Sequence, residues 1–339
     1  MPDNINSPGL IVDPRSEEDK NKDYSHGEVA PMGIILKWDR TLADAPTYSQ
    51  RDQDGSGSCV AQSSAKALEV LRKGEVISAH PIYARRANLG SPGMWLQDAG
   101  NIVKKLGTTT ELLDPSQKMS EDKMNAPVLV ETPINGYLYA FPNVKNIDQV
   151  AEAIELYGHC KITIGCDGQE WSEKPIYNGT NNLNFFHDIC ATYYFTDEQG
   201  NKCLRCDESW GVNNPGHRII TESFLKFRGT GAMYFVPPVI PTPISKPQFN
   251  FKVPLLYGDE NFSVKMLQDI LKYEGLMDIK VFSSGKYLQL TSFGVDLLQR
   301  KYNIAPITEL DELAKSLGGY GRRVGMKTMG FLNQKYSQG

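Results

Sequence analysis

The spacing of apolar residues predicts helices in the first half of the chain and strands after residue 160. Apolar residues recur at helical intervals over 61–72, 96–106 and 147–157. Runs rich in β-branched and aromatic residues predict strands over 160–166, 188–196, 202–207 and 232–236. Because the helices come first and the strands follow, rather than alternating, the pattern favours an α+β fold.

A run of prolines divides the chain into two parts. Five prolines fall among the eleven residues 237–247, and proline suits neither a helix interior nor a central strand. We therefore expect a semi-rigid linker over 237–249, between a body at 31–236 and a C-terminal module at 250–339. Residues 1–30 are polar, so we expect a flexible segment there, or alternatively an arm that covers a cleft or docks on a partner.

Composition and charge narrow the function classes. The chain has 339 residues, of which 40% are apolar and 22% charged, so it can bury a core. Its net charge of −4 argues against nucleic acid as the main partner, because phosphate binding needs a basic surface. The first thirty residues do not resemble a signal peptide, and no stretch approaches the roughly 18 apolar residues of a membrane span. We expect a soluble chain made in a reducing cytoplasm, which reaches any target outside the cell by phage particle or lysis.

The segment 51–70 carries the clearest chemical signal. A turn of small residues, Gly-Ser-Gly-Ser, runs directly into a predicted helix, and Cys59 stands at the junction. The positive end of a helix dipole favours the thiolate form of a cysteine placed there. Gln53 lies six residues earlier. Its amide N–H and the backbone N–H of Cys59 together would form an oxyanion hole.

A thiolate nucleophile needs a partner that accepts and returns a proton. The chain has five histidines, and His187 is the one at the mouth of a predicted strand in the β-rich part. It lies 128 residues after Cys59, as expected for two groups that meet across a cleft between subdomains. His217 is expected in a loop, and His80 and His159 carry no motif.

Three segments, in this order, resemble the papain-like cysteine peptidases. Residues 53–59 resemble the family's Gln-Gly-Ser-Cys-Gly-Ser-Cys, with the same spacing from Gln to Cys. His187 matches the family's imidazole before a strand, and residues 208–211, Glu-Ser-Trp-Gly, resemble its Asn-Ser-Trp-Gly. The resemblance covers about residues 30–236 and implies a two-subdomain body, with a helical half and an antiparallel β half.

The resemblance implies a role for each matched residue. Cys59 is expected to be the nucleophile, paired as a thiolate with an imidazolium at His187. Gln53 is expected to hold the oxyanion of the tetrahedral intermediate. Trp210 is expected to shield the hydrogen bond that orients the imidazole.

The chain also departs from the family pattern. Glu208 stands where the family has its orienting Asn, and a carboxylate can still accept the ring N–H. The neighbouring Asp207 is an alternative for this role. Val60 replaces the usual aromatic residue after the nucleophile, and Ser56 replaces a disulfide cysteine. These departures keep open a catalytically silent copy of the fold.

The other cysteines are expected to do less. Cys203 and Cys206 have the CxxC spacing of zinc and redox sites, but no second pair accompanies them. On a predicted strand, residues three apart face opposite sides. Cys160, Cys166 and Cys190 lie among apolar residues and are expected in the core. We therefore expect no bound metal or cofactor.

The C-terminal module carries a quasi-repeat of amphipathic segments. Helical spacing begins near residues 264, 291 and 321, and each segment contains Leu-Gln or Leu-Asn. Three such helices would pack into a small bundle. The pattern resembles three-helix peptidoglycan-binding domains, which implies a bacterial cell wall as partner, and a generic docking bundle is the alternative. The candidate wall-binding residues, expected as an exposed polar and aromatic set, are Tyr257, Tyr287, Arg322 and Arg323.

These features together predict a modular cysteine peptidase. Its substrate would be a peptide bond in a protein or in a peptidoglycan stem peptide, and the C-terminal module would concentrate it there by tethering. A wall-binding module without an export signal suggests a phage or prophage lysin, or a virion-associated protein with other virion proteins as partners. The alternatives are a non-catalytic phage structural or attachment protein, and an amidase of the CHAP type, whose Cys-to-His distance is usually much shorter.

Overall fold

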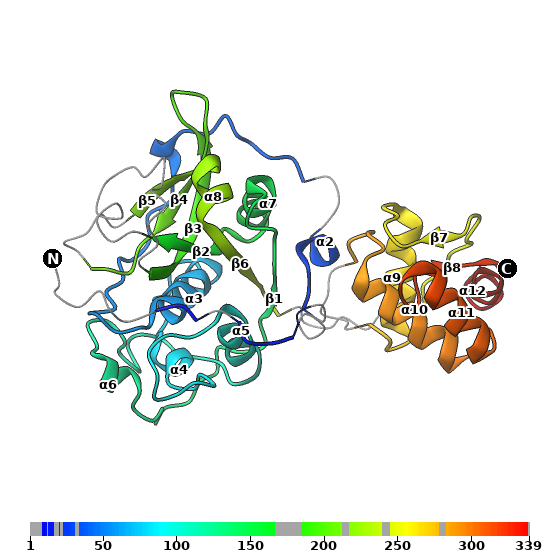
Figure 1. The fold of residues 1–339 in the computed structure, drawn as a ribbon, viewed down its shortest axis with the longest axis horizontal. Coiled ribbons are helices and arrows are strands. Elements are labelled where there is room, and N and C mark those ends of the chain that lie inside the picture. Colours follow the sequence, from blue (N-terminus) through cyan, green and yellow to red (C-terminus); the bar gives the residue numbers. More distant parts are fainter. Residues whose placement is uncertain are drawn as a thin grey trace. The chain divides into compact units, whose positions relative to one another are not determined.

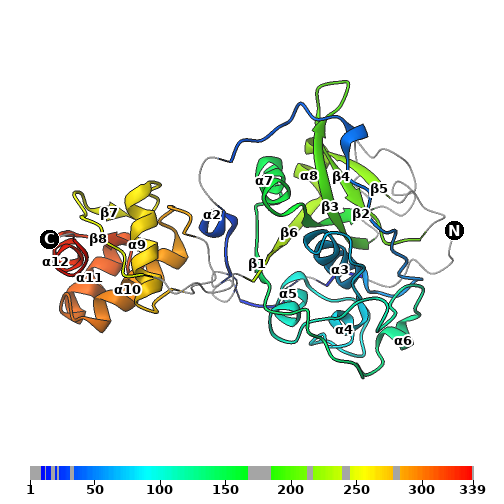
Figure 2. The ribbon, with the colours of Figure 1, turned by 180° about the vertical axis from the view of Figure 1, so that it is seen from behind.

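The chain folds into two compact units, seen from two sides in Figures 1 and 2. By their contacts, Met1–Glu17 and Ile35–Pro237 form one unit, and Glu18–Ile34 and Pro238–Gly339 form the other. The computed structural model describes residues 9–11, 13–16, 20, 23–30, 34–166, 185–211, 217–238, 245–277 and 283–337. Residues 239–244 of the expected linker lie outside the described residues.

The first unit combines short helices with one antiparallel sheet. The helices are η1 (Leu42–Asp44), α3 (Cys59–Leu71), α4 (His80–Tyr83), α5 (Leu96–Lys105), α6 (Glu121–Met124), α7 (Ile147–Tyr157) and α8 (Glu222–Arg228). The strands are β1 (Leu138–Ala140), β2 (Cys160–Cys166), β3 (Phe185–Thr196), β4 (Lys202–Asp207), β5 (His217–Thr221) and β6 (Gly229–Val236). They pair in the order β1-β6-β2-β3-β4-β5, always antiparallel. The predicted α+β class is therefore confirmed.

The elements form where local sequence signals agree with packing. Helix α7 has its predicted bounds, because the Asn146 side chain caps its first turn and Gly158, at φ 76°, ends it. Strands β2 and β4 also have their predicted bounds. The pattern does not predict β5 and α8, which follow each other without a break. Thr221 both ends β5 and caps α8, accepting a hydrogen bond from the Phe224 N–H.

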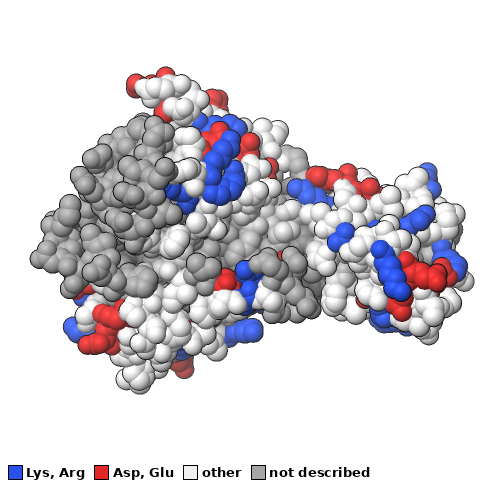
Figure 3. Space-filling view, in the orientation of Figure 1, with Lys and Arg blue, Asp and Glu red and all other residues white. Residues whose placement is uncertain are grey.

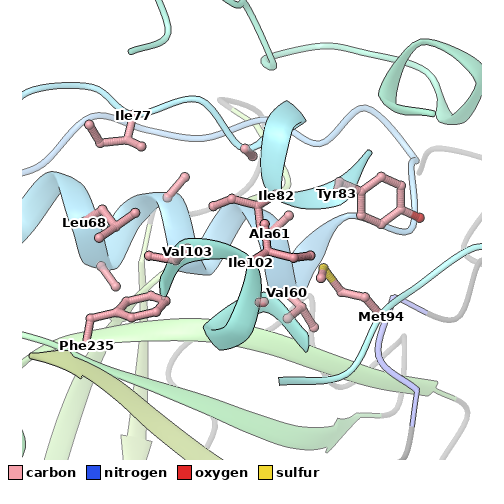
Figure 4. Close-up of a cluster of buried hydrophobic side chains, with 14 of the residues drawn as sticks. Val60, Ala61, Leu68, Ile77, Ile82, Tyr83, Met94, Ile102, Val103 and Phe235 are labelled. Atoms are coloured by element: carbon pink, nitrogen blue, oxygen red, sulfur yellow. The ribbon is translucent and has the colours of Figure 1, made fainter. Parts of the chain in front are cut away.

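The sheet is covered on both sides. In both views α3 lies on one side of the sheet and α7 on the other, with α4 and α5 beyond α3 (Figures 1 and 2). Figure 4 shows the apolar cluster around α3, where Val60 and Leu68 meet Ile102, Val103 and Phe235. This packing fixes the helix that begins at Cys59.

The described part of the second unit contains the three predicted helices and two more, one short and one long. Its described elements are α2 (His26–Val29), β7 (Leu255–Leu256), α9 (Phe262–Tyr273), α10 (Gln289–Lys301), α11 (Ile307–Leu317), β8 (Arg323–Val324) and α12 (Met326–Tyr336). The additional long helix is α11, which buries Leu310 and Ala314. Its apolar residues at 307, 310, 313 and 317 have helical spacing, which the prediction missed. The third predicted segment begins as strand β8 and becomes helical at Met326.

The quasi-repeat corresponds to a repeated hydrogen bond. The Gln268 amide donates to Thr291 Oγ1 at 2.9 Å, which joins α9 to α10. The Gln299 amide donates to Thr328 Oγ1 at 3.0 Å, which joins α10 to α12. All four side chains are buried, where a polar group requires a partner. The recurring Gln and Thr positions therefore hold the bundle together.

Part of the N-terminal segment packs in the second unit. Gly27 of α2 lies against α10, with Leu288 Cδ1 only 2.7 Å from an ideal Cβ position. His26 and Ala30 are buried. The expected flexible segment at residues 1–30 thus includes residues with defined contacts.

Charges of both signs are interspersed on the face of each unit shown in Figure 3. Among the described residues on that face, neither unit presents a stripe of one sign. No helix within the described ranges is long and apolar enough to span a membrane.

Candidate active site

Cys59 begins α3, and the loop before it is fixed by its own hydrogen bonds. The Gln53 carbonyl accepts hydrogen bonds from the Ser56 backbone N–H at 2.9 Å and from Ser56 Oγ at 2.6 Å. Gly57 permits a close approach, because a Cβ there would lie 2.6 Å from the Gly93 nitrogen. The fully buried thiol is thereby held at the first turn of α3, whose N–H groups lack helical partners.

His187 and Glu208 come from neighbouring strands. His187 lies near the start of β3, and Glu208 directly follows β4, which pairs with β3. Their buried side chains meet with 2.7 Å between His187 Nε2 and Glu208 Oε1. The Cys59 thiol is hydrogen-bonded to the same imidazole. Because Nε2 faces the carboxylate, Nδ1 is the ring nitrogen that remains for the thiol.

The imidazole is charged at neutral pH in this arrangement. Burial alone lowers the pKa of His187, because it penalises the charged form. The Glu208 carboxylate and the Cys59 thiol outweigh burial and raise that pKa to about 10. Burial alone would raise the pKa of Glu208, but His187, the Ser209 N–H at 2.8 Å and Arg218 lower it. The two groups therefore form an imidazolium–carboxylate pair.

Of the two neighbouring acids, the structure places Glu208 on the imidazole. The Asp207 carboxylate instead accepts a hydrogen bond from Thr192 Oγ1 at 2.9 Å and lies 3.3 Å from Arg205 Nη2. Burial raises the pKa of Asp207, and Arg205 opposes that rise. Asp207 thus belongs to a separate ion pair, and it does not orient His187.

Trp210 packs on the imidazole. Cys190 pairs with Asp207 across β3 and β4, and continuing this antiparallel register sets His187 opposite Trp210. The ring centroids of His187 and Trp210 are 4.9 Å apart at an interplanar angle of 40°. The Phe185 ring lies 5.7 Å from that of Trp210. The Phe185 ring also lies near the imidazole, with 6.4 Å between the ring centroids of Phe185 and His187.

Gln53 is anchored beside the nucleophile loop. Its Oε1 accepts a hydrogen bond from Ser209 Oγ at 2.7 Å, and its Nε2 donates to the Ser56 carbonyl at 2.7 Å. An amide nitrogen carries two hydrogens, so one N–H remains beyond the bond to Ser56. Gln53 therefore retains a donor for the oxyanion role that the sequence predicts.

Residues 9–11, which we call the N-terminal strap, lie against the nucleophile. Leu10 forms a parallel bridge with Met94. The Met94 carbonyl accepts a hydrogen bond from the Ile11 N–H at 3.1 Å, and the Met94 N–H donates to the Gly9 carbonyl at 3.4 Å. An ideal Cβ on Gly9 would lie only 2.5 Å from Cys59 Sγ. The strap therefore occupies the space directly beside the thiol. The sequence predicts a covering arm only as one alternative for the N-terminal segment.

His80 and His159 make contacts within the fold, and His217 begins strand β5 rather than lying in the expected loop. His80 Nδ1 lies 2.8 Å from Asp114 Oδ2, and His159 accepts a hydrogen bond from the Phe235 N–H at 3.0 Å. Burial lowers the pKa of His159 to about 4. All six cysteines are described, all are buried, and none is bridged. Within the described ranges, no cluster of His, Cys, Asp or Glu could hold a metal ion.

Two groups of buried charged residues were not predicted from the sequence. Arg218 of β5 is fully buried, and its Nε lies 3.6 Å from Glu208 Oε2. Lys161 of β2 lies 3.3 Å from Asp188 of β3, which also accepts a hydrogen bond from Ser63 of α3. This second group joins the nucleophile helix to the strand that carries His187. In the sequence, a charged residue within an otherwise apolar strand indicates a buried ion pair. It does not show which residue of opposite charge lies beside it.

The four candidate wall-binding residues differ in their exposure to solvent. Tyr257 is partly exposed, and the Arg322 guanidinium lies over its ring at 4.3 Å. Arg323 is exposed on β8. Tyr287 is fully buried and donates its hydroxyl to the Gly321 carbonyl at 2.6 Å. The expectation of an exposed Tyr287 is therefore wrong, because the ring fills the core of the second unit.

No protein-family model matches the sequence, and no curated protein matches it. Solved structures of cysteine proteases are similar to the chain. Digestive procathepsin L 3 of the Tenebrio molitor larval midgut has 17% identity and a TM-score of 0.49, covering 68% of this chain and 83% of that one. Xylellain, a cysteine protease from Xylella fastidiosa, has 15% identity and a TM-score of 0.49, covering 63% and 97%. The bromelain protease from Ananas comosus has 16% identity and a TM-score of 0.44, covering 57% and 94%.

Proposed function

We propose that the chain is a cysteine peptidase that cleaves peptide bonds through a thiolate–imidazolium pair. The observation that carries the proposal is the buried imidazole of His187, held between the Cys59 thiol and the Glu208 carboxylate. A ring fixed on one side by an acid and facing a thiol on the other is the arrangement that nucleophilic catalysis requires. The chemistry needs no group beyond these side chains and water.

The proposed reaction has two steps. The Cys59 sulfur attacks the carbonyl carbon of the scissile bond, and the oxyanion that forms accepts hydrogen bonds from the Gln53 amide and the Cys59 backbone N–H. His187 gives its proton to the departing amine, the C–N bond breaks, and a thioester remains. His187 then takes a proton from water, whose oxygen attacks the thioester and releases the acid and the thiolate. Glu208 keeps the imidazole oriented throughout.

The decisive experiment compares wild type with Cys59→Ala on two substrates, denatured casein and purified peptidoglycan. We expect hydrolysis of at least one by the wild type, and a loss of about a thousandfold or more in Cys59→Ala. Cys190→Ala is the matched control, because Cys190 is equally buried in the same apolar cluster but is not the thiol that faces His187. The substrate that is cleaved identifies the class of scissile bond. Equal results for wild type and Cys59→Ala on both substrates would support the non-catalytic attachment protein instead.

We further propose that the second unit binds the bacterial cell wall, as expected of a phage or prophage lysin or virion-associated protein. Support comes from the partly exposed Tyr257, whose ring lies under the half-buried Arg322 guanidinium, and from the adjacent exposed Arg323, because aromatic and cationic groups together can bind polar ligands. Sedimentation with purified peptidoglycan tests this. Tyr257→Ala should weaken binding by about tenfold. Lys327→Ala, which removes an exposed cation from the same unit, should bind like wild type, and wild-type protein that stays in solution would contradict the proposal.

A further inference from the structure

Four ionisable side chains lie together at the candidate active site. Three are Cys59, His187 and Glu208. The fourth is Arg218, which pairs with Cys206 across β5 and β4. Glu208 comes two residues after Cys206, so Arg218 and Glu208 lie toward the same side of the sheet. Their side chains are fully buried, with 3.6 Å between Arg218 Nε and Glu208 Oε2.

The charges of these four groups balance. A thiolate and a carboxylate supply two negative charges, and an imidazolium and a guanidinium supply two positive charges. Without Arg218, the catalytic pair and Glu208 would leave one uncompensated negative charge away from water, which is strongly unfavourable. Burial would then favour protonation of Glu208, and a protonated carboxyl is a poorer acceptor for the His187 ring N–H.

We propose that Arg218 is a positioning residue that keeps Glu208 ionised, so that Glu208 can hold the His187 imidazolium beside Cys59. This inference rests on the proposed peptidase function. Arg218 does not touch the reacting atoms, and it acts through Glu208. The two partners of Glu208 use different carboxylate oxygens. His187 Nε2 lies 2.7 Å from Oε1, and Arg218 Nε lies 3.6 Å from Oε2.

The charged and titratable groups around Arg218, Glu208 and His187 affect any titration of the Cys59 thiol. Glu208 and Cys166, at the end of β2, act electrostatically on Arg218. His187 and Arg218 act on Glu208, and Glu208 and Cys59 act on His187. Cys160, Cys190, Cys203 and Cys206 have their pKa values raised by burial, so their thiols stay protonated at neutral pH.

The test follows the ultraviolet absorbance of the Cys59 thiolate in the full-length protein as the pH rises, with Cys59→Ser as the baseline. Arg218→Met should let Glu208 become protonated and weaken its hold on the His187 imidazolium, so the thiolate should appear at a pH about one unit higher than in wild type. Glu208→Gln removes the same carboxylate directly and should also shift the midpoint upward. The double variant, Glu208→Gln with Arg218→Met, should have the midpoint of Glu208→Gln alone, because Arg218 acts through Glu208.

Two further variants keep the result interpretable. Arg228→Met neutralises another buried arginine of the same unit, which bonds to the Gly165 carbonyl, and its midpoint should match wild type. Arg218→Lys keeps the charge and should shift the midpoint less than Arg218→Met. If Arg218→Met does not fold, the double variant should still fold, because it buries neither charge. A double variant as unfolded as Arg218→Met would overturn the proposal.

The outcomes separate this inference from the proposed function. If wild type shows no thiolate absorbance beyond Cys59→Ser near neutral pH, the thiolate–imidazolium pair is absent and the peptidase proposal fails. If wild type shows the thiolate but folded Arg218→Met has the wild-type midpoint, the role of Arg218 is overturned while the peptidase proposal stands.

Discussion

At the scale of single residues, local chemistry determined what could be predicted. Cys59, His187 and Glu208 each lie in a short recognisable segment, and the structure brings the three together. Arg218 could not be predicted as their partner, because its contact with Glu208 depends on the register between β5 and β4. Tyr287 was misjudged for a related reason, since no local pattern shows which aromatic ring fills a core.

The charge on His187 makes stability depend on pH. Its pKa in the folded protein is raised to about 10, against an ordinary value of 6.5. A group whose pKa rises on folding contributes stability that is fully present below the unfolded pKa and is lost as the pH rises through the folded one. The contribution of His187 is therefore complete below about pH 6.5 and declines toward about pH 10.

We expect this contribution to appear in a comparison of wild type with His187→Gln by urea unfolding. The difference in unfolding free energy should be largest near pH 6 and should shrink steadily toward about pH 10. His80→Gln is the control, because His80 pairs with Asp114 in the same unit and takes no part in the site. A difference for His187→Gln that stays constant over this range would show that the imidazole is not held in its charged form.

At the scale of elements, periodicity predicted those that combine a clear pattern with clear ends. Helix α7 and strands β2 and β4 have both, and their bounds agree with the prediction. Elements that follow one another without a polar break, such as β5 and α8, gave no separate signal. Neighbouring elements, rather than local sequence, determine such cases.

The N-terminal strap is an element whose effect on reactivity can be measured. Gly9 lies so close to Cys59 that a larger side chain would have to displace either the thiol or the strap. We expect Gly9→Val to loosen the strap and to raise the rate of Cys59 alkylation by iodoacetamide by about tenfold, equivalent to about 1.4 kcal/mol in the closing equilibrium. Peptide mapping would assign the modified cysteine.

Gly330→Ala is the matched control for this substitution, because a Cβ at Gly330 meets no neighbouring atom. It should alkylate at the wild-type rate. An unchanged or slower rate in Gly9→Val would mean that the strap does not limit access to the thiol.

At the scale of the whole molecule, the described residues of each unit form a core of their own, around α3 in the first unit and among α9, α10 and α12 in the second. The proline run predicted a boundary near residue 237, where the contacts also divide the chain. The sequence did not show that the N-terminal segment contributes to both units, with residues 9–11 in the first and residues 23–30 in the second. Contacts between residues so distant in the chain leave no local pattern.

Glu274 offers a test of whether the two units unfold separately. In the second unit its carboxylate accepts hydrogen bonds from Lys301 at 2.8 Å and Lys335 at 2.7 Å, and from the hydroxyls of Tyr302 and Tyr336. Burial alone raises the pKa of Glu274, but these four donors lower it below the ordinary value of 4.5. A carboxyl group whose pKa falls on folding contributes stability that is present above that ordinary value and is lost as the pH decreases further.

We therefore expect two calorimetric transitions, and Glu274→Gln should lower the Tm of only one of them, by about 5 °C at neutral pH. The difference from wild type should shrink as the pH falls below about 4.5, because Glu274 then takes up a proton in the unfolded chain before it does in the folded protein. Glu309→Gln removes an exposed ion pair with Lys327 in the same unit, and it should leave both transitions in place. A single transition that shifts as a whole in Glu274→Gln would contradict separate unfolding, since the loss of hydrogen bonds in one core would then destabilise both units together.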